Sequence, residues 1–286
     1  MVTLPVTITR RAGLGAITAA AAAPFMTPAQ ANPMTVQTAS GPITPALFNA
    51  WIALRGGEDG PGYWYSDGLV RTMADGAVDS RMIGVETWIT PKDLRTETSA
   101  VSISRKVYFF LERGRDVIVT DKATGKPRRP SIFAYQVRTF RLKDGAIEYS
   151  VESHDTVSPR MGGAGSVYTI TATGDQVHVN YAVFRTVPEK NGATSARGEI
   201  YDYFDHGPAL KEMHQRYQGT WSSANTLGQM ANLMNWRYPS FDAIPNEWLK
   251  AHIRKNGPMW MAPPRDMAEI DALRKTAPIK TDLIPV

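Results

Sequence analysis

The chain has 286 residues, with 32 basic and 27 acidic side chains and a formal net charge of +5. It contains no cysteine, which excludes disulfide bonds, thiol nucleophiles, iron–sulfur clusters and thiolate zinc sites. Basic and acidic residues are interleaved along the chain, so the charge pattern does not favour a nucleic-acid partner.

The N-terminal segment has the three parts of an export signal. Arg10 and Arg11 precede an uncharged, alanine-rich stretch over 16–23, and a small-x-small cleavage site, Ala29-Gln30-Ala31, follows. Paired arginines before a modest apolar stretch indicate the twin-arginine route. The stretch is too short to span about 30 Å of hydrocarbon. We therefore predict an export signal over 1–31 and a periplasmic protein without a membrane span.

Removing this signal leaves 255 residues with 30 basic and 27 acidic side chains, enough for one large domain or two small ones. Residues 32–43 are rich in Pro, Thr and Ser and predict a flexible N-terminal arm. The rest, 44–286, is predicted to form a single domain whose last part, from about 207 onward, is helical.

The domain is predicted to begin with a helix. Thr44 is suited to the N-cap and Pro45 to the first helical position. Apolar residues follow at helical spacing, and Gly56-Gly57 ends the helix.

From Tyr63 to about Asp205 the apolar period changes to two, which is typical of half-buried strands. Short turns separate these strands, so neighbouring strands must pair antiparallel. A sheet of eight or nine strands is expected to curl, because closure removes exposed edges. The predicted strands are 63–73, 81–90, 100–111, 132–142, 146–154, 166–173, 177–186 and 198–205, with a less regular one at 116–121.

Helical spacing returns after Gly207. The four helices predicted there begin at Pro208, at Ser222 or Ser223, at Pro245 and at Asp266. The second of them would extend through Met234. Each is short and has one apolar stripe, so the helices are expected to cover one mouth of the sheet. The fold class is thus mainly β with peripheral helices (α+β), an antiparallel β-barrel-like domain with a helical cover.

Common catalytic motifs are absent from the sequence. It has no GxGxxG after a strand, no GxxxxGK[ST], no HExxH and no GxSxG. No cofactor and no metal are predicted. A metal site built from His, Asp and Glu of several strands stays open, although no close spacing indicates one.

Aromatic and polar side chains recur on the predicted strands. Alternate residues of a strand share a face, so Tyr201 and Tyr203 point together, as do Glu86 and Trp88. If that face lines a curled sheet, the cavity suits a flat aromatic or otherwise apolar ligand with a few polar groups. His206 follows a carboxylate at the end of a strand, which favours acid–base chemistry or a structural role.

The first functional hypothesis is a cofactor-independent lyase, isomerase or hydratase acting on an aromatic or terpenoid-like small molecule. The alternative is a non-catalytic binding or carrier protein for such a molecule, and a third is a structural or assembly protein. The sequence leaves the oligomeric state open, including a homo-oligomer. In the enzyme hypothesis Tyr203 and His206 transfer protons, Arg138 and Glu86 hold a charge or a hydroxyl group, and Tyr65, Trp88, Tyr135, Trp221 and Trp236 form the ligand-binding walls.

Four segments resemble an exported family of bacteria and fungi, domain of unknown function 1838. The segments are the strand 63–68 (YWYSDG), the strand 83–88 (IGVETW), the turn 121–126 (DKATGK) and the strand 199–204 (EIYDYF). The resemblance extends from about residue 44 to 260. It implies a twin-arginine leader and a predominantly antiparallel β-domain, and it implies no reaction and no catalytic residues.

Overall fold

The computed structural model describes residues 41–57, 60–122, 124–155, 159–163, 165–188, 194–207, 216–225, 228–276 and 283. The predicted export signal and most of the predicted arm lie outside these residues. The predicted helix start at Pro208 also lies outside them.

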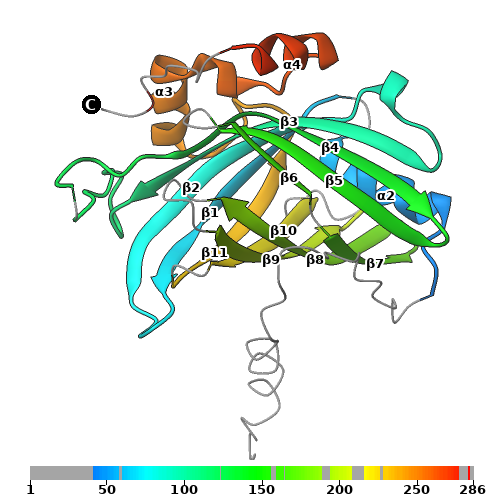
Figure 1. Ribbon diagram of the computed structural model, residues 1–286, viewed down its shortest axis with the longest axis horizontal. Coiled ribbons are helices and arrows are strands. Elements are labelled where there is room, and N and C mark those ends of the chain that lie inside the picture. Colours follow the sequence, from blue (N-terminus) through cyan, green and yellow to red (C-terminus); the bar gives the residue numbers. More distant parts are fainter. Residues whose placement is uncertain are drawn as a thin grey trace, which may run out of the picture. The chain divides into compact units, whose positions relative to one another are not determined.

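An antiparallel sheet of eleven strands forms the body of the protein (Figure 1). Neighbouring strands follow the order β6-β5-β4-β3-β2-β1-β11-β10-β9-β8-β7, so most pairs are consecutive hairpins and β1 pairs with β11. The strands are β1 (Gly62–Thr72), β2 (Val78–Ile89), β3 (Ser99–Leu111), β4 (Ser131–Lys143), β5 (Ala146–Asp155), β6 (Pro159–Gly163), β7 (Gly165–Thr173), β8 (Gln176–Pro188), β9 (Thr194–Asp205), β10 (Tyr217–Asn225) and β11 (Gln229–Tyr238).

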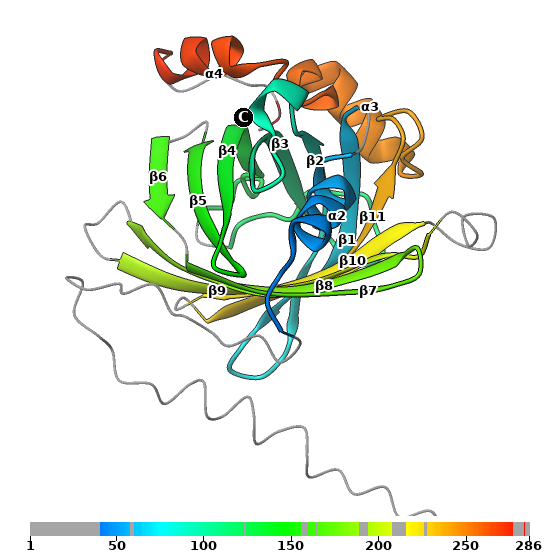
Figure 2. The ribbon, with the colours of Figure 1, turned by 90° about the vertical axis from the view of Figure 1, so that its right-hand side faces the viewer.

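The sheet curls into a half-barrel (Figure 2). Its two ends approach each other, because β5 contacts β7 and β6 contacts β8. In the described ranges no strand pairing joins these ends. The predicted mainly β, antiparallel architecture with a few helices is therefore confirmed.

Two-residue turns account for the tightest hairpins. Asp144 and Gly145 between β4 and β5 both have positive φ, at 52° and 74°, as the twist of a type I′ hairpin requires. After glycine and asparagine, aspartate is the residue type that adopts this conformation most readily, which suits Asp144 to the turn. The turn motifs in the sequence thus determine that the strands on either side of each turn pair as a hairpin.

The segment after β9 differs from its prediction. Within the helix predicted from Ser222 or Ser223 through Met234, residues 222–225 instead form the end of β10 and residues 229–234 form the first part of β11. Their burial alternates: Leu233 and Asn235 are buried, whereas Asn232 and Met234 are exposed. Apolar residues at 230, 233 and 234 match a helix, but pairing of β11 with both β1 and β10 outweighs that local pattern. The predicted strand at 116–121 makes only isolated bridges, and β6 was not predicted.

Helix α2 (Pro45–Gly56) lies on the concave face of the sheet. As predicted, Thr44 caps it by accepting a hydrogen bond from the Leu47 amide at 3.3 Å, and Gly57 follows with a φ of 90°. Phe48 and Trp51 pack in a buried cluster with residues of β1, β2, β4, β8 and β9. The helix therefore occupies part of the interior of the half-barrel.

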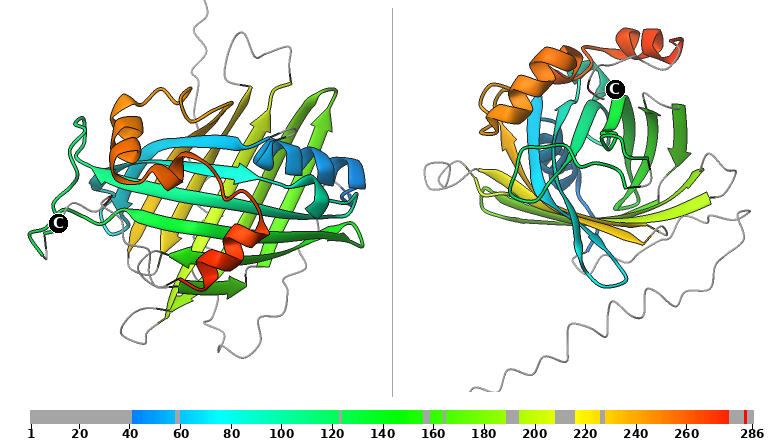
Figure 3. Two further views of the ribbon diagram at one scale, coloured as in Figure 1. Left: turned by 90° about the horizontal axis from the view of Figure 1, so that it is seen from above. Right: turned by 90° about the vertical axis from the view of Figure 1, so that its left-hand side faces the viewer.

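Three short helical elements lie on the convex face instead, over β1 to β4 (Figure 3). They are α3 (Glu247–Asn256), η3 (Pro258–Met261) and α4 (Met267–Arg274), and a further turn, η1 (Lys92–Leu94), precedes β3. Asn246 caps α3 and Asp266 caps α4, so these two predicted helices are confirmed. Within the described part of the chain, no helix has the length and apolar character needed to cross a membrane.

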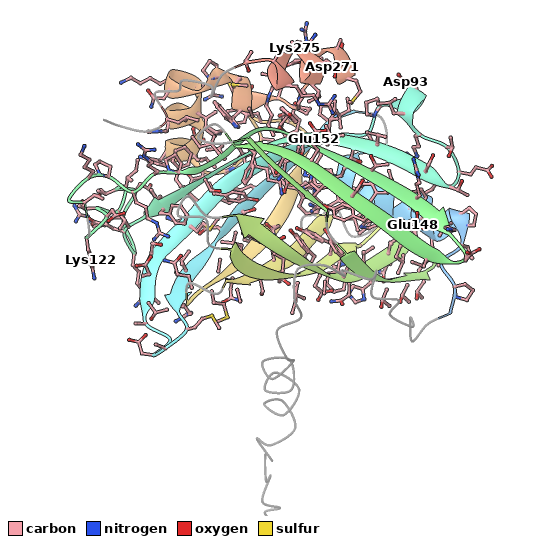
Figure 4. All side chains as sticks on the ribbon, in the orientation of Figure 1. Asp93, Lys122, Glu148, Glu152, Asp271 and Lys275 are labelled. Carbon is pink, nitrogen blue, oxygen red and sulfur yellow. The ribbon has the colours of Figure 1, made fainter. Side chains whose placement is uncertain are left out.

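Ion pairs join α4 to the sheet. Arg274 of α4 binds Glu152 of β5 with two nitrogens, at 2.5 and 2.7 Å. Figure 4 shows Glu152 beneath α4, which carries Asp271, while Glu148 lies farther along the same strand. The convex face of β1 to β5 is thus the surface on which the C-terminal helices pack.

Candidate functional site: a cavity inside the half-barrel

The concave face encloses a cavity with a volume of about 120 Å³. Its inner end is polar, with the buried side chains of Glu86, Lys106, Gln136 and Asn235. Its walls are largely rings and aliphatic groups, which are Val70, Met82, Tyr108, Phe110, Phe133, Tyr201, Tyr203, Trp221 and Ala231.

A bulge in β4 shapes this lining. Lys106 of β3 pairs with Phe133, whereas Ser104, two residues earlier, pairs with Gln136. Three β4 steps thus match two β3 steps, and one extra β4 residue is accommodated. The bulge directs both Phe133 and Gln136 into the cavity, although their spacing of three would place them on opposite faces of a regular strand.

Two glycines make room for tyrosine rings on this face. A Cβ added to Gly84 would approach the Tyr108 ring to 2.3 Å and the Val107 carbonyl oxygen to 2.3 Å. A Cβ added to Gly219 would approach the Tyr203 ring to 2.2 Å. The two rings therefore lie across the neighbouring strands and form part of the cavity wall.

Three cations surround the carboxylate of Glu86. Lys106 Nζ lies 2.6 Å from Oε1, Arg138 Nη2 lies 3.3 Å from Oε1, and Arg55 Nη2 lies 3.7 Å from Oε2. Burial would raise the pKa of Glu86, but Lys106, Arg138 and Arg55 together hold it below its ordinary value. Glu86 is therefore an anion at neutral pH.

Backbone contacts at the end of α2 position Arg55. The Trp64 indole donates to the Arg55 carbonyl oxygen at 3.0 Å, and Arg237 donates to the Ala53 and Leu54 carbonyl oxygens at 2.7 and 2.6 Å. The Arg55 guanidinium then lies 4.3 to 5.2 Å from the ring centres of three aromatic residues, which are Trp64, Trp88 and Tyr203. Burial acts to lower its pKa, but nearby tyrosines and Glu86 raise the pKa above its ordinary value.

Arg138 has polar partners on several sides. It donates to Gln136 Oε1 at 2.5 Å, to Ser104 Oγ at 3.0 Å and to the Tyr149 hydroxyl at 3.0 Å. Its guanidinium also lies 4.0 Å from the centre of the Trp88 ring. Arg138 is therefore held rigidly beside Glu86.

Three tyrosines of the interior, Tyr108, Tyr181 and Tyr203, are neutral at physiological pH. Burial raises the pKa of Tyr203 to about 12, although Arg55 opposes the shift. Burial also raises the pKa of Tyr108 and Tyr181 well above the ordinary value of tyrosine. These hydroxyl groups keep their protons and can donate hydrogen bonds to a ligand.

Several buried N–H groups that line the interior have no hydrogen-bond partner within the described residues. Asn235 Nδ2 and Trp221 Nε1 belong to the main cavity. Asn235 Oδ1 accepts from Ser66 Oγ at 2.5 Å, so Nδ2 is the part of this amide that is left without a partner. Arg55, whose Nε and Nη1 are unpartnered, and Trp88, whose Nε1 is unpartnered, line a second cavity of about 10 Å³, close to the least space that holds one water molecule.

The main cavity reaches partly exposed residues at Phe110 and Arg128. The Arg128 guanidinium lies 3.8 Å from the centre of the Phe110 ring and forms an ion pair with Asp79. The side chain of Arg128 is 21% exposed, whereas Glu86 is buried. We identify this end as the mouth of the cavity.

Five of the predicted site residues share the concave face, namely Glu86, Trp88, Arg138, Tyr203 and Trp221. The other four lie elsewhere. Tyr65 stacks on Trp236 beneath α3 at a ring distance of 6.0 Å, and Tyr135 donates to Glu152 at 2.9 Å. His206 stacks on Phe204 and contacts Gln218, on the face opposite Tyr203. The structure therefore separates the predicted proton pair Tyr203 and His206.

Sequence reasoning missed Arg55, Lys106, Glu199 and Asn235. Lys106 carried one usable signal, because a charged residue directly before the apolar run from Val107 to Leu111 needs a buried partner if its side chain points inward. Its partner Glu86 is paired with it across β2 and β3, and that register is not visible in the sequence.

Comparisons with known proteins return no family model, no curated protein and no solved structure that matches the chain. The resemblance to domain of unknown function 1838 therefore stays a prediction. In the described part of the chain, no three His, Asp or Glu side chains are grouped so as to hold a metal ion.

Proposed function

We propose that the protein binds a small molecule with an aromatic or otherwise apolar ring inside the half-barrel. The cavity of about 120 Å³ is the observation that supports this proposal. An apolar cavity of about 150 Å³ takes up one benzene molecule, so the somewhat smaller space here has the size of a single ring, and any larger ligand would extend toward the mouth. Rings combined with a few buried polar groups are typical of ligand pockets.

Binding without catalysis is the function we favour. Acid–base catalysis near neutral pH works best with a group whose pKa lies near 7. Burial moves the pKa of Tyr203 and Tyr108 upward, and the surrounding cations move that of Glu86 downward. All three shifts lead away from neutrality.

A cofactor-independent lyase, isomerase or hydratase is the second candidate. Tyr203 contributes a protonated hydroxyl group to the cavity, and Glu86 and Arg138 lie on the same concave face. In such an enzyme Tyr203 would donate a proton while Glu86 and Arg138 orient the substrate. Tyr203→Phe should then abolish turnover and leave binding intact, whereas His206→Ala on the opposite face should leave turnover unchanged.

Two further parts of the proposal concern delivery and closure. We propose that residues 1–31 direct export to the periplasm by the twin-arginine route. The helices α3 and α4, which were predicted to cover one mouth, pack on the convex face instead. We therefore propose that α2 covers one mouth of the half-barrel, which leaves the opening at Phe110 and Arg128 for ligand entry. Packing of Phe48 and Trp51 against the concave face supports this role of α2.

Native mass spectrometry of protein purified from the periplasm tests the proposed binding. We expect a small organic molecule bound to each chain, and single-ring compounds that raise the melting temperature of the stripped protein. Ala231→Phe should fill the cavity and abolish both effects, because Ala231 lines it. Asn232→Phe is the matched control, since the next residue of β11 is exposed on the other face. Equal binding by both variants would contradict the proposal.

A further inference from the structure

The charges that line the interior are unbalanced. The described lining of the two cavities includes four basic side chains, of Arg55, Lys106, Arg128 and Arg138, and two acidic ones, of Glu86 and Glu199. Arg128 pairs with Asp79 at the mouth. Lys106, Glu86 and Glu199 line the main cavity, and Arg55 and Arg138 line the second cavity while pairing with Glu86. Taken together, these described side chains carry one positive charge more than negative charges, and a low dielectric makes an uncompensated charge unfavourable. An anionic ligand would compensate it.

Unpartnered donors provide independent support for an anion. Asn235 is 3% exposed, and its Nδ2 has no hydrogen-bond partner in the described chain. Trp221, in the same cavity, is partly exposed as a residue, but its Nε1 is buried and has no partner in the described chain. In the register of β10 and β11, Trp221 is opposite Leu233, and Asn235 is two residues farther along the same face. Neighbouring N–H groups without acceptors fit a ligand that supplies acceptor oxygens.

We propose that the ligand is an aromatic carboxylate, held by Asn235 and Trp221 in the field of the Arg55, Lys106 and Arg138 cations. This inference rests on the proposed binding function and specifies the chemical class of the ligand. The carboxylate oxygens accept from Asn235 Nδ2 and Trp221 Nε1, and the ring lies along the wall of Val70, Met82 and Phe110 toward the mouth. Charge-assisted hydrogen bonds of this kind are stronger than neutral ones.

Matched pairs of ligands test the proposal. Benzoate, phenylacetate and cinnamate are titrated into the purified protein by calorimetry at pH 7, each beside its neutral amide. We expect each acid that binds to bind about tenfold or more tightly than its amide. Equal or tighter binding of the amides would overturn the carboxylate while leaving the binding function in place. Absence of binding by every acid and amide would overturn both.

Asn235→Asp gives a sharper test on the protein side. The substitution keeps an oxygen that accepts from Ser66 and replaces the amide donor by a second carboxylate oxygen. The acid should then bind about tenfold or more weakly. The amide has N–H donors from which the new carboxylate can accept hydrogen bonds, so the affinity of the acid relative to that of the amide should fall. Asn232→Asp, exposed on the same strand, adds the same charge on the outer face and should change neither affinity.

Trp221→Phe removes one N–H donor and keeps an aromatic ring. It is the test variant if circular dichroism shows that Asn235→Asp does not fold. The affinity for the acid should fall about tenfold, with a smaller change for the amide. Unchanged affinity for the acid in each folded variant would overturn the proposal.

Discussion

Arginine and tryptophan side chains are buried on both faces of the sheet, but their hydrogen-bond partners differ between the faces. On the convex face, Arg105 donates to the carbonyl oxygens of Ala134, Met259 and Ala262 at 3.0 to 3.2 Å and pairs with Glu269. On the concave face, Arg55 shares Glu86 with two other cations, and its Nε and Nη1 have no hydrogen-bond partner in the described chain.

The tryptophans show the same contrast. Trp260 on the convex face donates its indole N–H to the Phe133 carbonyl oxygen at 3.1 Å. The indole N–H groups of Trp88 and Trp221 on the concave face have no partner in the described residues. Thr87 Oγ1 and His252 Nε2 on the convex face also have no partner in the described residues, but neither lines a cavity, whereas Trp88 and Trp221 do. Because buried donors are nearly always satisfied in native proteins, unpartnered donors beside a cavity are the ones that a bound molecule can satisfy.

Glu86→Gln should produce the largest loss of stability. Three buried cations would lose their common anion, and removing one partner of a buried ion pair costs about 3–5 kcal/mol. Glu269→Gln on the convex face should cost only about 1 kcal/mol, because Glu269 is partly exposed and Arg105 keeps its carbonyl acceptors. Urea unfolding of both variants measures the difference, and equal losses would remove the contrast between the two faces.

Acid should weaken the concave face through the same carboxylate. The pKa of Glu86 is lower in the folded protein than in the unfolded chain, so its stabilising contribution is complete above about pH 4.3 and is lost as the pH falls through the folded pKa. The stability difference between the wild type and Glu86→Gln should therefore shrink below about pH 4.3. Unfolding curves from pH 7 to pH 3 measure it, and a constant difference would contradict the assignment.

Gly84→Ala should cost about 1–3 kcal/mol, the range for overpacking. The new methyl group would meet the Val107 carbonyl oxygen and the Tyr108 ring at 2.3 Å, so β3 or the ring must move. Ligand affinity should fall as well, because Tyr108 lines the cavity. Gly60→Ala is the control, since a Cβ there meets nothing within 4 Å. If Gly84→Ala left the free energy of unfolding unchanged, the Tyr108 ring and β3 would move without cost and the tight packing would not matter for stability.

Asn246→Ala should have the smallest effect. It removes the N-cap of α3, whose side chain accepts from the Leu249 amide at 2.8 Å, and such losses cost about 1 kcal/mol. Since α3 packs on the convex face, the variant should bind the ligand as tightly as the wild type. Thermal unfolding and calorimetry on one preparation measure both quantities, and weaker binding would show that the two faces are coupled.

Elements with strong local signals were predictable. Thr44 and Pro45 at the start of α2, Asp266 at the start of α4 and the glycine turns all act within a few residues. The segment around Leu233 was not predictable, because its apolar residues fit a helix and a strand, and pairing with β1 decided between them.

The site was predictable only in part. Period two correctly placed Tyr203 on the same face as Tyr201 and Glu86 on the same face as Trp88, but it could not tell which face is concave. Tyr65 and Trp236 look as suitable for a ligand as Trp88 does, yet they lie beneath α3. The inward direction of a face depends on the curl of the whole sheet.

The amino-acid sequence by itself determined the alternation of the strands, the turns between them and the caps of the helices, because these depend on neighbouring residues. Only the tertiary structure decided that Arg55 of α2, Glu86 of β2 and Lys106 of β3 meet in one buried cluster. Strand register, the bulge in β4 and the curl of the sheet bring them together, and each depends on contacts between residues far apart in the chain.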